Sequence, residues 1–483
     1  MTASPDLLGL DEVRALIASE DPEGRLPSCG LSQLIVGPGA LDLLVAAVSR
    51  TAEGISGRPV RVALLVDQTT IQRQGLNVKS RVLADLQRDF EATHVVLSEG
   101  HSELHVTDAV VDEAARRCSD ADVIVALGGG TISDIGKLVA ARLPSVRVVT
   151  VMTAASVDGY TDDVSVTLKD GVKRTVPSVW PHVVLADAET VAEAPARMNQ
   201  AGYGEMVSMY VAPADWRLAS MLGIDTSFHR APIALLEALG GALDACAAGV
   251  ALGEPAAVQG LTQALAIRGI ATGVAGTTAC LSGVEHLISH MLDLRAAELH
   301  LPTGLHGEQV GAGSVVAACA WEMLHDRVSA NPDATVSTAA LDRGAAEIRV
   351  RSAFADIDPT GRIGSECWND YERKLARVVD ALPRIDSVLR NWPNQAAELR
   401  ALARPSPFIA TGLRAAGAPA LLGELGSDVD TNTARWAVEN CALMRERFTV
   451  VDLLTLLGWW TPSDLDEVLE RVDHAVSVAG VPA

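Results

Sequence analysis

Positive charge is scarce in this chain of 483 residues, which has 39 Lys and Arg against 61 Asp and Glu and a formal net charge of −22. A chain this acidic is a poor partner for nucleic acid or for an anionic membrane surface, because both repel it. The chain also lacks an uninterrupted apolar run of about 18 residues, so no membrane insertion is expected. These absences leave a small molecule as the expected partner.

Targeting and disulfide signals are missing as well. The N-terminal segment is acidic and lacks the basic-then-apolar pattern of a secretory signal. The seven cysteines are scattered, odd in number and without CxxC spacing, which indicates a reducing compartment. We therefore expect a cytoplasmic protein. Its length of 483 residues predicts two domains. A homo-oligomer, such as a homodimer, is expected although no motif specifies it.

The segment DVIVALGGGTISDIGK at 122–137 is the most informative feature that is present. A short apolar strand runs into three glycines, which lack a Cβ and let backbone N–H groups approach an anion closely. Thr131 and Ser133 can cap the helix that follows, and the N-terminus of that helix favours a phosphate. Because the pattern is not GxGxxG, a plain tight turn remains the alternative.

A second apolar strand at 146–152 ends in the polar loop TAASVDGYT at 153–161. Together the two strands and the helix between them form a βαβ unit, and ligands of open parallel sheets bind at the carboxyl ends of strands. Asp158 lies in this loop, where it either contacts a ligand or caps its own backbone.

The alternation of strands and helices predicts the fold class. Up to residue 195 it indicates a Rossmann-like, doubly wound α/β dinucleotide-binding domain, and from 196 to 483 a helical domain, with the site in the cleft between them. The expected strands are 33–36, 62–66, 94–97, 123–127, 146–152, 164–167 and 182–186. Expected helices include 40–51, 106–117, 233–248, 255–272 and 310–326. We interpret the polar segment 331–407 as extra helices, with an oligomer interface or a lid as alternatives.

Histidines provide a second constellation. His286 and His290 lie four residues apart on one face of a predicted helix, His306 follows a helix-breaking PTG, and Glu205 lies upstream in GYGE. Two imidazoles and a carboxylate with one open position are a common catalytic site for a divalent metal. HExxH is absent, so the metalloprotease pattern is excluded. The alternative is a pair of histidines that serves only the helix.

These motifs together resemble the sn-glycerol-1-phosphate dehydrogenase family, within the superfamily of iron-type alcohol dehydrogenases and dehydroquinate synthases. The similarity covers roughly 31–458. It rests on GGGTISDIGK, TAASVDGYT, DGVKRT at 170–175, GYGE, the residues up to Asp215 and Trp216, EHLISH at 285–290, LHGEQVGAG at 305–313 and RERFTVVDLLTLLG at 445–458. The segment 331–407 is longer than this resemblance leads us to expect.

The resemblance implies a role for each matching residue. It implies a metal site at Glu205, His286 and His306 for zinc, nickel or iron, and catalytic or substrate-contacting roles for His290, Asp158, Glu205 and Lys173. NAD, with NADP possible, would contact Asp67, Gly128, Gly129, Gly130, Thr131, Ile132, Ser133, Asp134, Thr153, Ala154, Ala155, Ser156 and Asp162. The implied activity is metal-dependent, NAD(P)-linked interconversion of sn-glycerol 1-phosphate and dihydroxyacetone phosphate, or of a related polyol and ketone.

Three departures from the family pattern keep other functions open. Where this chain has Glu205 and Met209, the family usually has Asp and Lys. Where this chain has Asp162, the family often has Ser. Glu is the ligand of the dehydroquinate synthase branch, so a sugar-phosphate cyclase is the alternative, followed by a specialised homologue with an altered substrate. Positive charge for an anionic ligand can come from Lys137, Lys173 and Arg174. Asp67 would repel a 2′-phosphate, which favours NAD.

Overall fold

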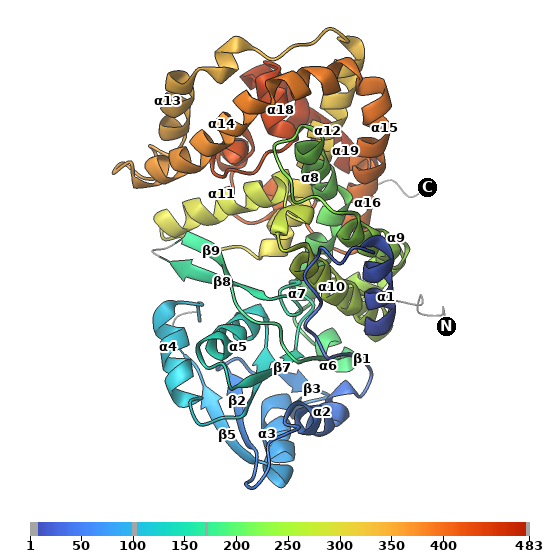
Figure 1. Cartoon of the computed structure of the whole chain (residues 1–483), viewed down its shortest axis with the longest axis vertical. Coiled ribbons are helices and arrows are strands. Elements are labelled where there is room, and N and C mark those ends of the chain that lie inside the picture. The colour runs from blue at the N-terminus through green and yellow to red at the C-terminus, as the bar shows by residue number, and fades with distance from the viewer. Residues whose placement is uncertain (1–7, 99–103, 170–171, 480–483) are drawn as a thin grey trace. The chain divides into compact units, whose positions relative to one another are not determined.

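The computed structural model describes residues 8–98, 104–169 and 172–479 (Figure 1). By packing, the chain forms two compact units, one made of Met1–Tyr203 with Arg230–Gly276 and the other of Gly204–His229 with Thr277–Ala483. The first unit therefore extends past the predicted boundary at residue 195 and takes in two long helices of the segment predicted to be the helical domain. These helices, α9 (Arg230–Ala251) and α10 (Pro255–Ala275), pack on each other, and they also pack on α1 (Leu10–Glu20) and α6 (Ala188–Ala192) of the first unit.

A six-stranded parallel sheet forms the centre of the first unit, as the strand and helix alternation predicts. From edge to edge its strands are β1 (Gln33–Gly37), β10 (Val183–Asp187), β7 (Arg147–Met152), β6 (Val123–Gly128), β2 (Arg61–Val66) and β5 (Glu91–Val96). The inner strands are mostly apolar and almost entirely buried, which is typical of a parallel sheet covered on both faces.

Helices cover both faces of this sheet. In β2, Leu64 belongs to the core formed with α2 (Leu44–Thr51) and α3 (Val78–Asp89). The next residue, Leu65, points to the other face and belongs to the core formed with α4 (Asp108–Arg117) and α5 (Gly130–Arg142). This period of two along each strand is the pleat of a β-sheet, and it confirms the doubly wound fold.

The strand order reverses between β2 and β6. From β2 the chain continues outward to β5, then returns to β6 and continues through β7 and β10 in the other direction. In open α/β sheets ligands bind outside the carboxyl ends of the strands at such a switch point. Here those ends carry Asp67, directly after β2, and the glycines 128–130 at the end of β6.

The remaining elements of the first unit include two short antiparallel pairs. The predicted strand 164–167 is the first strand of a hairpin. Its second strand was not predicted, because Lys, Arg and Thr interrupt its apolar residues. The predicted helix 40–51 begins with a separate 3-10 turn. The remaining elements of the first unit are α1 (Leu10–Glu20), η1 (Ala40–Leu43), β3 (Gln72–Arg73), β4 (Leu76–Asn77), β8 (Val164–Lys169), β9 (Val172–Pro177), α6 (Ala188–Ala192), α9 (Arg230–Ala251) and α10 (Pro255–Ala275).

Among the described residues, α9 is the one helix that is long and apolar enough to cross a membrane by length and composition alone. Half of its most apolar window is buried within the structure. Core helices of globular proteins pass the same test, so this is weak evidence for a membrane span.

The second unit is helical throughout its described part. Helix α7 (Ala196–Met206) leads into it from the first unit, and the predicted segment 310–326 lies within α12. The segment 331–407 forms helices, as predicted. After α7, the elements of the second unit are η2 (Val207–Tyr210), α8 (Ala212–Met221), η3 (Thr278–Cys280), α11 (Val284–Glu298), α12 (His306–Ala330), η4 (Thr338–Leu341), α13 (Arg343–Ala353), α14 (Arg362–Arg390), α15 (Trp392–Leu402), α16 (Ser406–Ala415), η5 (Leu422–Glu424), α17 (Thr431–Asn440), η6 (Cys441–Leu443), α18 (Val450–Leu456) and α19 (Pro462–Ala479).

All seven cysteines are free, and six of them are buried. This agrees with the interpretation of the cysteines as small core residues and not as disulfide partners.

A buried histidine in the second unit predicts acid sensitivity. The His325 ring lies between Trp321 and Trp392, with centroids 5.6 and 5.5 Å away, and neither ring nitrogen has a hydrogen-bond partner among the described residues. Burial, with the charge of Arg400, lowers the pKa of His325 to about 4, against an ordinary value of 6.5.

Between pH 6.5 and 4 the unfolded chain therefore binds a proton at His325 that the folded chain does not, and stability falls as the pH falls. At pH 5 this costs about 2 kcal/mol relative to pH 7.5. Urea unfolding at both pH values, followed by tryptophan fluorescence, should show that His325→Phe loses this part of the pH dependence. An unchanged pH dependence in His325→Phe would contradict the assignment.

Candidate functional site

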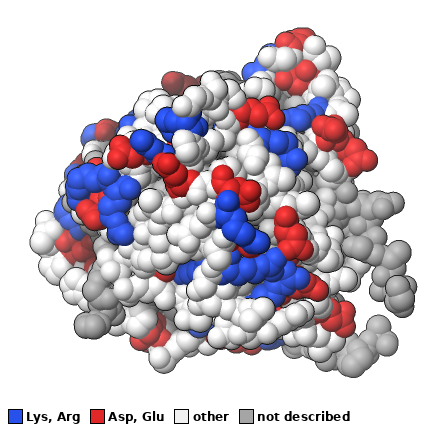
Figure 2. Space-filling model, turned by 90° about the horizontal axis from the view of Figure 1, so that it is seen from below, with Lys and Arg blue, Asp and Glu red and all other residues white. Residues whose placement is uncertain are grey.

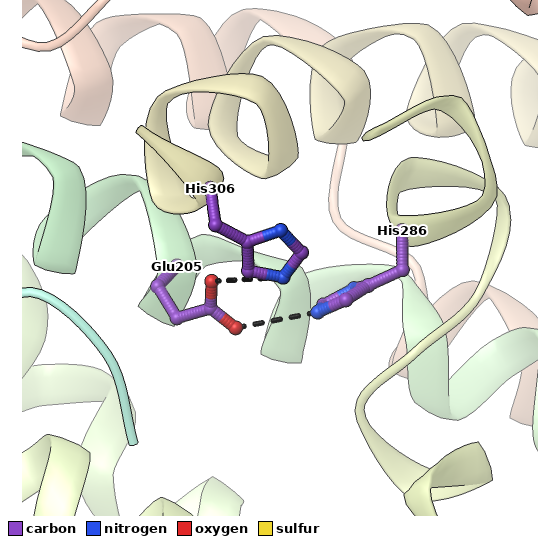
Figure 3. Close-up of side chains that lie close together, drawn as sticks. All are labelled: Glu205, His286 and His306. Carbon is purple, nitrogen blue, oxygen red and sulfur yellow. Dashed lines mark hydrogen bonds and ion pairs between the residues drawn. The ribbon is translucent and has the colours of Figure 1, made fainter. Parts of the chain in front are cut away.

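Three predicted metal ligands come together within the second unit. Glu205 lies in the last turn of α7, His286 in the first turn of α11, and His306 is the first residue of α12. Their ligand atoms all lie within 4.8 Å of one another, and Figure 3 shows both imidazoles directed toward the carboxylate. Nε2 of His286 is 3.3 Å from Oε1 of Glu205, and Nε2 of His306 is 3.7 Å from Oε2.

Glycines allow the three helices to approach closely enough for this convergence. A Cβ on Gly204 would lie 2.2 Å from the carbonyl oxygen of Gly307, and one on Gly311 would lie 2.9 Å from the Cα of Gly204. On the same helix α12, a Cβ on Gly313 would lie 2.9 Å from the carbonyl oxygen of Glu285. The glycines of GYGE and LHGEQVGAG therefore permit two backbone crossings that bring α7 and α11 onto α12.

Neighbouring side chains fix the orientation of both imidazoles. Nδ1 of His286 is 2.8 Å from Oε1 of Glu285, whose carboxylate can only accept, so this nitrogen carries the proton. Ser289 donates its hydroxyl hydrogen to Gln309 at 2.7 Å, which leaves the Ser289 oxygen to accept from Nδ1 of His306 at 2.9 Å. In both rings Nε2 is thus the nitrogen directed toward Glu205, as a metal ligand requires.

The donor set fits a divalent metal. Glu205 and His286 are buried and His306 is partly exposed. Burial opposes a charge on His286, but the hydrogen bonds and charges of Glu205 and Glu285 outweigh burial and raise its pKa to about 9. A proton and a metal ion would therefore compete for Nε2 of His286. Two imidazole nitrogens and a carboxylate, oriented by buried partners, suit zinc, nickel or iron.

His290 and Met209 complete the surroundings that the sequence singles out. The His290 ring stacks on His306 with centroids 5.9 Å apart and is partly exposed. Met209, which occupies the family's usual lysine position, is buried at 6% exposure. Because residue 209 is methionine, this position supplies no positive charge to the site.

In the first unit, a glycine turn joins β6 to α5 as the sequence predicts, but the expected capping by Thr131 and Ser133 is wrong, because α5 begins earlier, at Gly130, and has no side-chain cap. Gly129 is the N-cap of α5, and its carbonyl oxygen accepts from the amides of Ile132 and Ser133. The first amides of a helix have no partner within it, so those of Gly130 and Thr131 remain for an anion. A Cβ on Gly129 would meet open space. The Ile132 side chain is part of the core, so it does not contact a ligand.

Asp67 is held by a lysine that sequence reasoning missed. Nζ of Lys79 lies 2.5 Å from Oδ1 of Asp67, and Thr69 donates its hydroxyl to Oδ2 at 3.0 Å. Lys79 is 7% exposed. Asp67 therefore presents a fixed carboxylate whose charge is partly balanced.

Lys137 does not provide the positive charge for an anionic ligand that the sequence suggests. Its side chain is fully buried, 2.6 Å from Asp162 and 3.4 Å from Asp134. Burial raises the pKa of both carboxyl groups, and the lysine opposes that rise. The charge of Lys137 is thus used within the fold, and the Asp162 side chain is its partner. Cofactor contacts of Asp134 and Asp162 stay predictions.

The loop after β7 contains the other predicted ligand contacts. Thr153, Ala154, Ala155 and Ser156 are buried, and the Ala155 amide donates to Asn199 at 3.0 Å. Asp158 is partly exposed, and its Oδ2 lies 2.6 Å from Nη1 of the buried Arg268. Lys173 pairs with Leu168 in the β8–β9 hairpin, but its side chain lies outside the described part of the structure.

Comparison with known proteins places this architecture in a family. The model of the family described as iron-containing alcohol dehydrogenase matches residues 35–195. The glycerol-1-phosphate dehydrogenase [NAD(P)+] of Natronomonas pharaonis is 30% identical over 358 residues, which are 74% of this chain and 90% of that protein. That of Aeropyrum pernix is 32% identical over 293 residues, 59% of this chain and 76% of that protein. The chain belongs to the glycerol-1-phosphate dehydrogenase family.

The fold of this glycerol-1-phosphate dehydrogenase family member is that of iron-type dehydrogenases. The crystal structure of glycerol dehydrogenase from Schizosaccharomyces pombe has a TM-score of 0.56 at 15% identity, covering 93% of this chain and 90% of the other. At this identity the likeness concerns the fold alone.

Sequence reasoning missed Glu285, Ser289 and Gln309, which orient the predicted ligands. A signal for them was present, because Glu285 precedes His286, and the other two follow His286 and His306 by three residues, on the same helix face.

Proposed function

We propose that this protein interconverts sn-glycerol 1-phosphate and dihydroxyacetone phosphate with NAD(P), using a divalent metal ion held by Glu205, His286 and His306. The observation that carries the proposal is the convergence of these three ligand atoms within 4.8 Å in a chain of this family. Zinc, nickel and iron all suit the donor set, and availability decides among them in the cell.

The chain's residues have distinct tasks in this mechanism. A bound divalent cation supplies Lewis acidity that stabilises negative charge developing on the substrate oxygen, typically worth several kcal/mol. Glu285 and Ser289 hold the imidazoles of His286 and His306 with Nε2 forward. His290, partly exposed and one helical turn after His286, would take the proton of the substrate hydroxyl at a ring nitrogen and return it to water. A bound nicotinamide dinucleotide would supply the hydride donor or acceptor for this reaction.

The dinucleotide would bind at the switch point of the sheet. The amides of Gly130 and Thr131 would hold the pyrophosphate, Thr153 to Ser156 would line the cofactor, and Asp67 would accept from the adenosine ribose. Asp67 favours NAD, but its pairing with Lys79 at 2.5 Å reduces repulsion of a 2′-phosphate, so NADP is accepted as well. Asp158, held by Arg268, and Lys173 are the proposed substrate contacts of the first unit.

The cyclase alternative rests on the choice of Glu at position 205. The relatives of this chain carry the name of a dehydrogenase, and EHLISH matches that branch, so we do not favour the cyclase. A cytoplasmic location and a homo-oligomer are part of the proposal.

Oxidation of NADH by dihydroxyacetone phosphate tests the proposal. Purified protein is freed of metal, then supplemented with Zn²⁺, Ni²⁺ or Fe²⁺, and NADH absorbance is followed, with NADPH in parallel. We expect a metal-dependent, stoichiometric loss of absorbance. Turnover of a sugar phosphate without net NADH change would support the cyclase, and metal-independent oxidation would contradict the metal site.

A further inference from the structure

The motif RERFTVVDLLTLLG at 445–458 has no part in the metal site or the dinucleotide site described above, yet its first residues are heavily hydrogen-bonded. The loop 444–449 and the start of α18 contact two parts of the second unit. One is the turn before α11, the helix that carries His286, and the other is α14, which belongs to the segment 331–407. Contacts on both sides connect α14 to the helix that carries the metal ligand.

Asp215, on α8, joins the N-termini of two helices. Its Oδ2 accepts from the amide of Val284, the first residue of α11, at 3.0 Å, and its Oδ1 accepts from the amide of Val450, the first residue of α18, at 2.9 Å. A buried carboxylate is well placed there, because the first amides of a helix have no partner within the helix and carry partial positive charge. Asp215 is 1% exposed.

The turn before α11 is fixed by the same carboxylate and by Glu285. Glu285 accepts from the Gly283 amide at 2.7 Å and from His286 at 2.8 Å. A Cβ on Gly283 would lie 2.4 Å from Oδ2 of Asp215 and 2.9 Å from Oε2 of Glu285, so the two carboxylates enclose this glycine. Asp215 thus sets the position of the turn from which His286 projects.

On the other side, the loop is held by Lys374 of α14. Its ammonium is buried, 2.6 Å from Oδ1 of Asp452 and 3.2 Å from the carbonyl oxygen of Arg447. Asp452 also accepts from the Thr449 amide at 2.8 Å, which closes the capping box of α18. The Arg447 guanidinium in turn donates to Thr278 and to the carbonyl oxygen of Ser282, just before α11.

From this network we propose that Asp215 and Lys374 are positioning residues for the metal ligand His286, and that α14 braces the metal site through the loop 444–449. The inference rests on the proposed metal site. If it holds, metal binding and the docking of α14 stabilise each other, because a coupling between two sites acts in both directions. Residues that orient metal ligands from outside the ligand set typically change metal affinity by about 10- to 100-fold.

The test measures the affinity for Zn²⁺ alone, by competition with a chromophoric chelator, in the full-length protein at a temperature where circular dichroism shows each variant folded. Asp215→Asn keeps the size of the side chain but can accept from only one of the two amides, and Lys374→Met removes the ammonium. Glu372→Gln is the matched control, because Glu372 also lies on α14 but accepts from Arg343 of α13 and not from a residue of this network.

We expect about a tenfold or larger loss of zinc affinity in Asp215→Asn and Lys374→Met, and wild-type affinity in Glu372→Gln. Hydrogen exchange of the wild type keeps the inference testable if a variant does not fold, since zinc should slow exchange at Val284, at Val450 and in α14 around Lys374. Wild-type affinity in both variants, or zinc protection that stops short of α14, would overturn the brace. A wild-type protein that binds no zinc would overturn the metal site itself.

Discussion

His286→Ala and Glu205→Gln are expected to lose bound metal and to lower kcat/KM by on the order of 10³-fold or more. The first removes one of two imidazole ligands, and the second keeps the side-chain volume but removes the charge of the only carboxylate in the ligand set. Loss of a Lewis acid that contributes several kcal/mol corresponds to such a factor. Metal content by elemental analysis and steady-state NADH oxidation measure the two effects separately.

His474→Ala is the control for these variants. His474 is an exposed residue of α19 in the same unit, so its removal should leave metal content and turnover unchanged. Retained metal and full turnover in His286→Ala would require another ligand set.

Gly204→Ala is expected to disrupt the metal site although it removes no functional group. The added Cβ would lie 2.2 Å from the backbone oxygen of Gly307, and a backbone cannot rotate away as a side chain can. Helices α7 and α12 must then separate, which moves Glu205 away from His306. Overpacking of this kind costs about 1–3 kcal/mol of stability, and the displaced ligands should lower zinc affinity at least tenfold.

Gly241→Ala provides a matched substitution. Gly241 also lies within a helix, α9, but a Cβ there would meet no atom within 4 Å. The free energy of unfolding of this variant should rise by up to about 1 kcal/mol, because alanine has a higher helix propensity than glycine. If Gly204→Ala behaved like Gly241→Ala and bound zinc normally, the close crossing would not be what positions the ligands.

Figure 2 shows why the overall acidity of the chain says little about local charge. On the face that it presents, Lys and Arg lie next to Asp and Glu at many positions, although the formal net charge is −22. Hydrogen bonds show such pairing directly for Arg58 and Asp122, which form a bidentate pair with nitrogen to oxygen distances of 2.6 and 2.5 Å. Net charge argues against nucleic acid as a partner class, which stays a prediction, and it could not say which cations serve the fold.

Local sequence patterns were sufficient for much of the fold. Apolar strands that end in glycine or polar loops gave the parallel sheet, because each strand's signal is contained in six or so consecutive residues. The two-residue strands β3 and β4 and the strand β9 were not predicted, since short or polar strands have no apolar period. Packing of α9 and α10 with the first unit was also out of reach, because it depends on contacts between segments far apart in the chain.

The candidate metal site, too, could be predicted only in part from the sequence. Glu205, His286 and His306 could be named from residue type and motif, whereas their convergence depends on the crossings at Gly204 and Gly313. The role expected of Lys137 was wrong because a lysine in a helix after a glycine turn looks alike in sequence whether it faces a phosphate or a buried Asp162.

The configuration of the product tests the central claim most directly. Metal-loaded protein is incubated with dihydroxyacetone phosphate and NADH, and the glycerol phosphate formed is assigned by chiral chromatography against both enantiomers. The account predicts sn-glycerol 1-phosphate, formed in equal amount to the NADH consumed and absent in His286→Ala. Formation of sn-glycerol 3-phosphate, or an equal yield from His286→Ala, would contradict it.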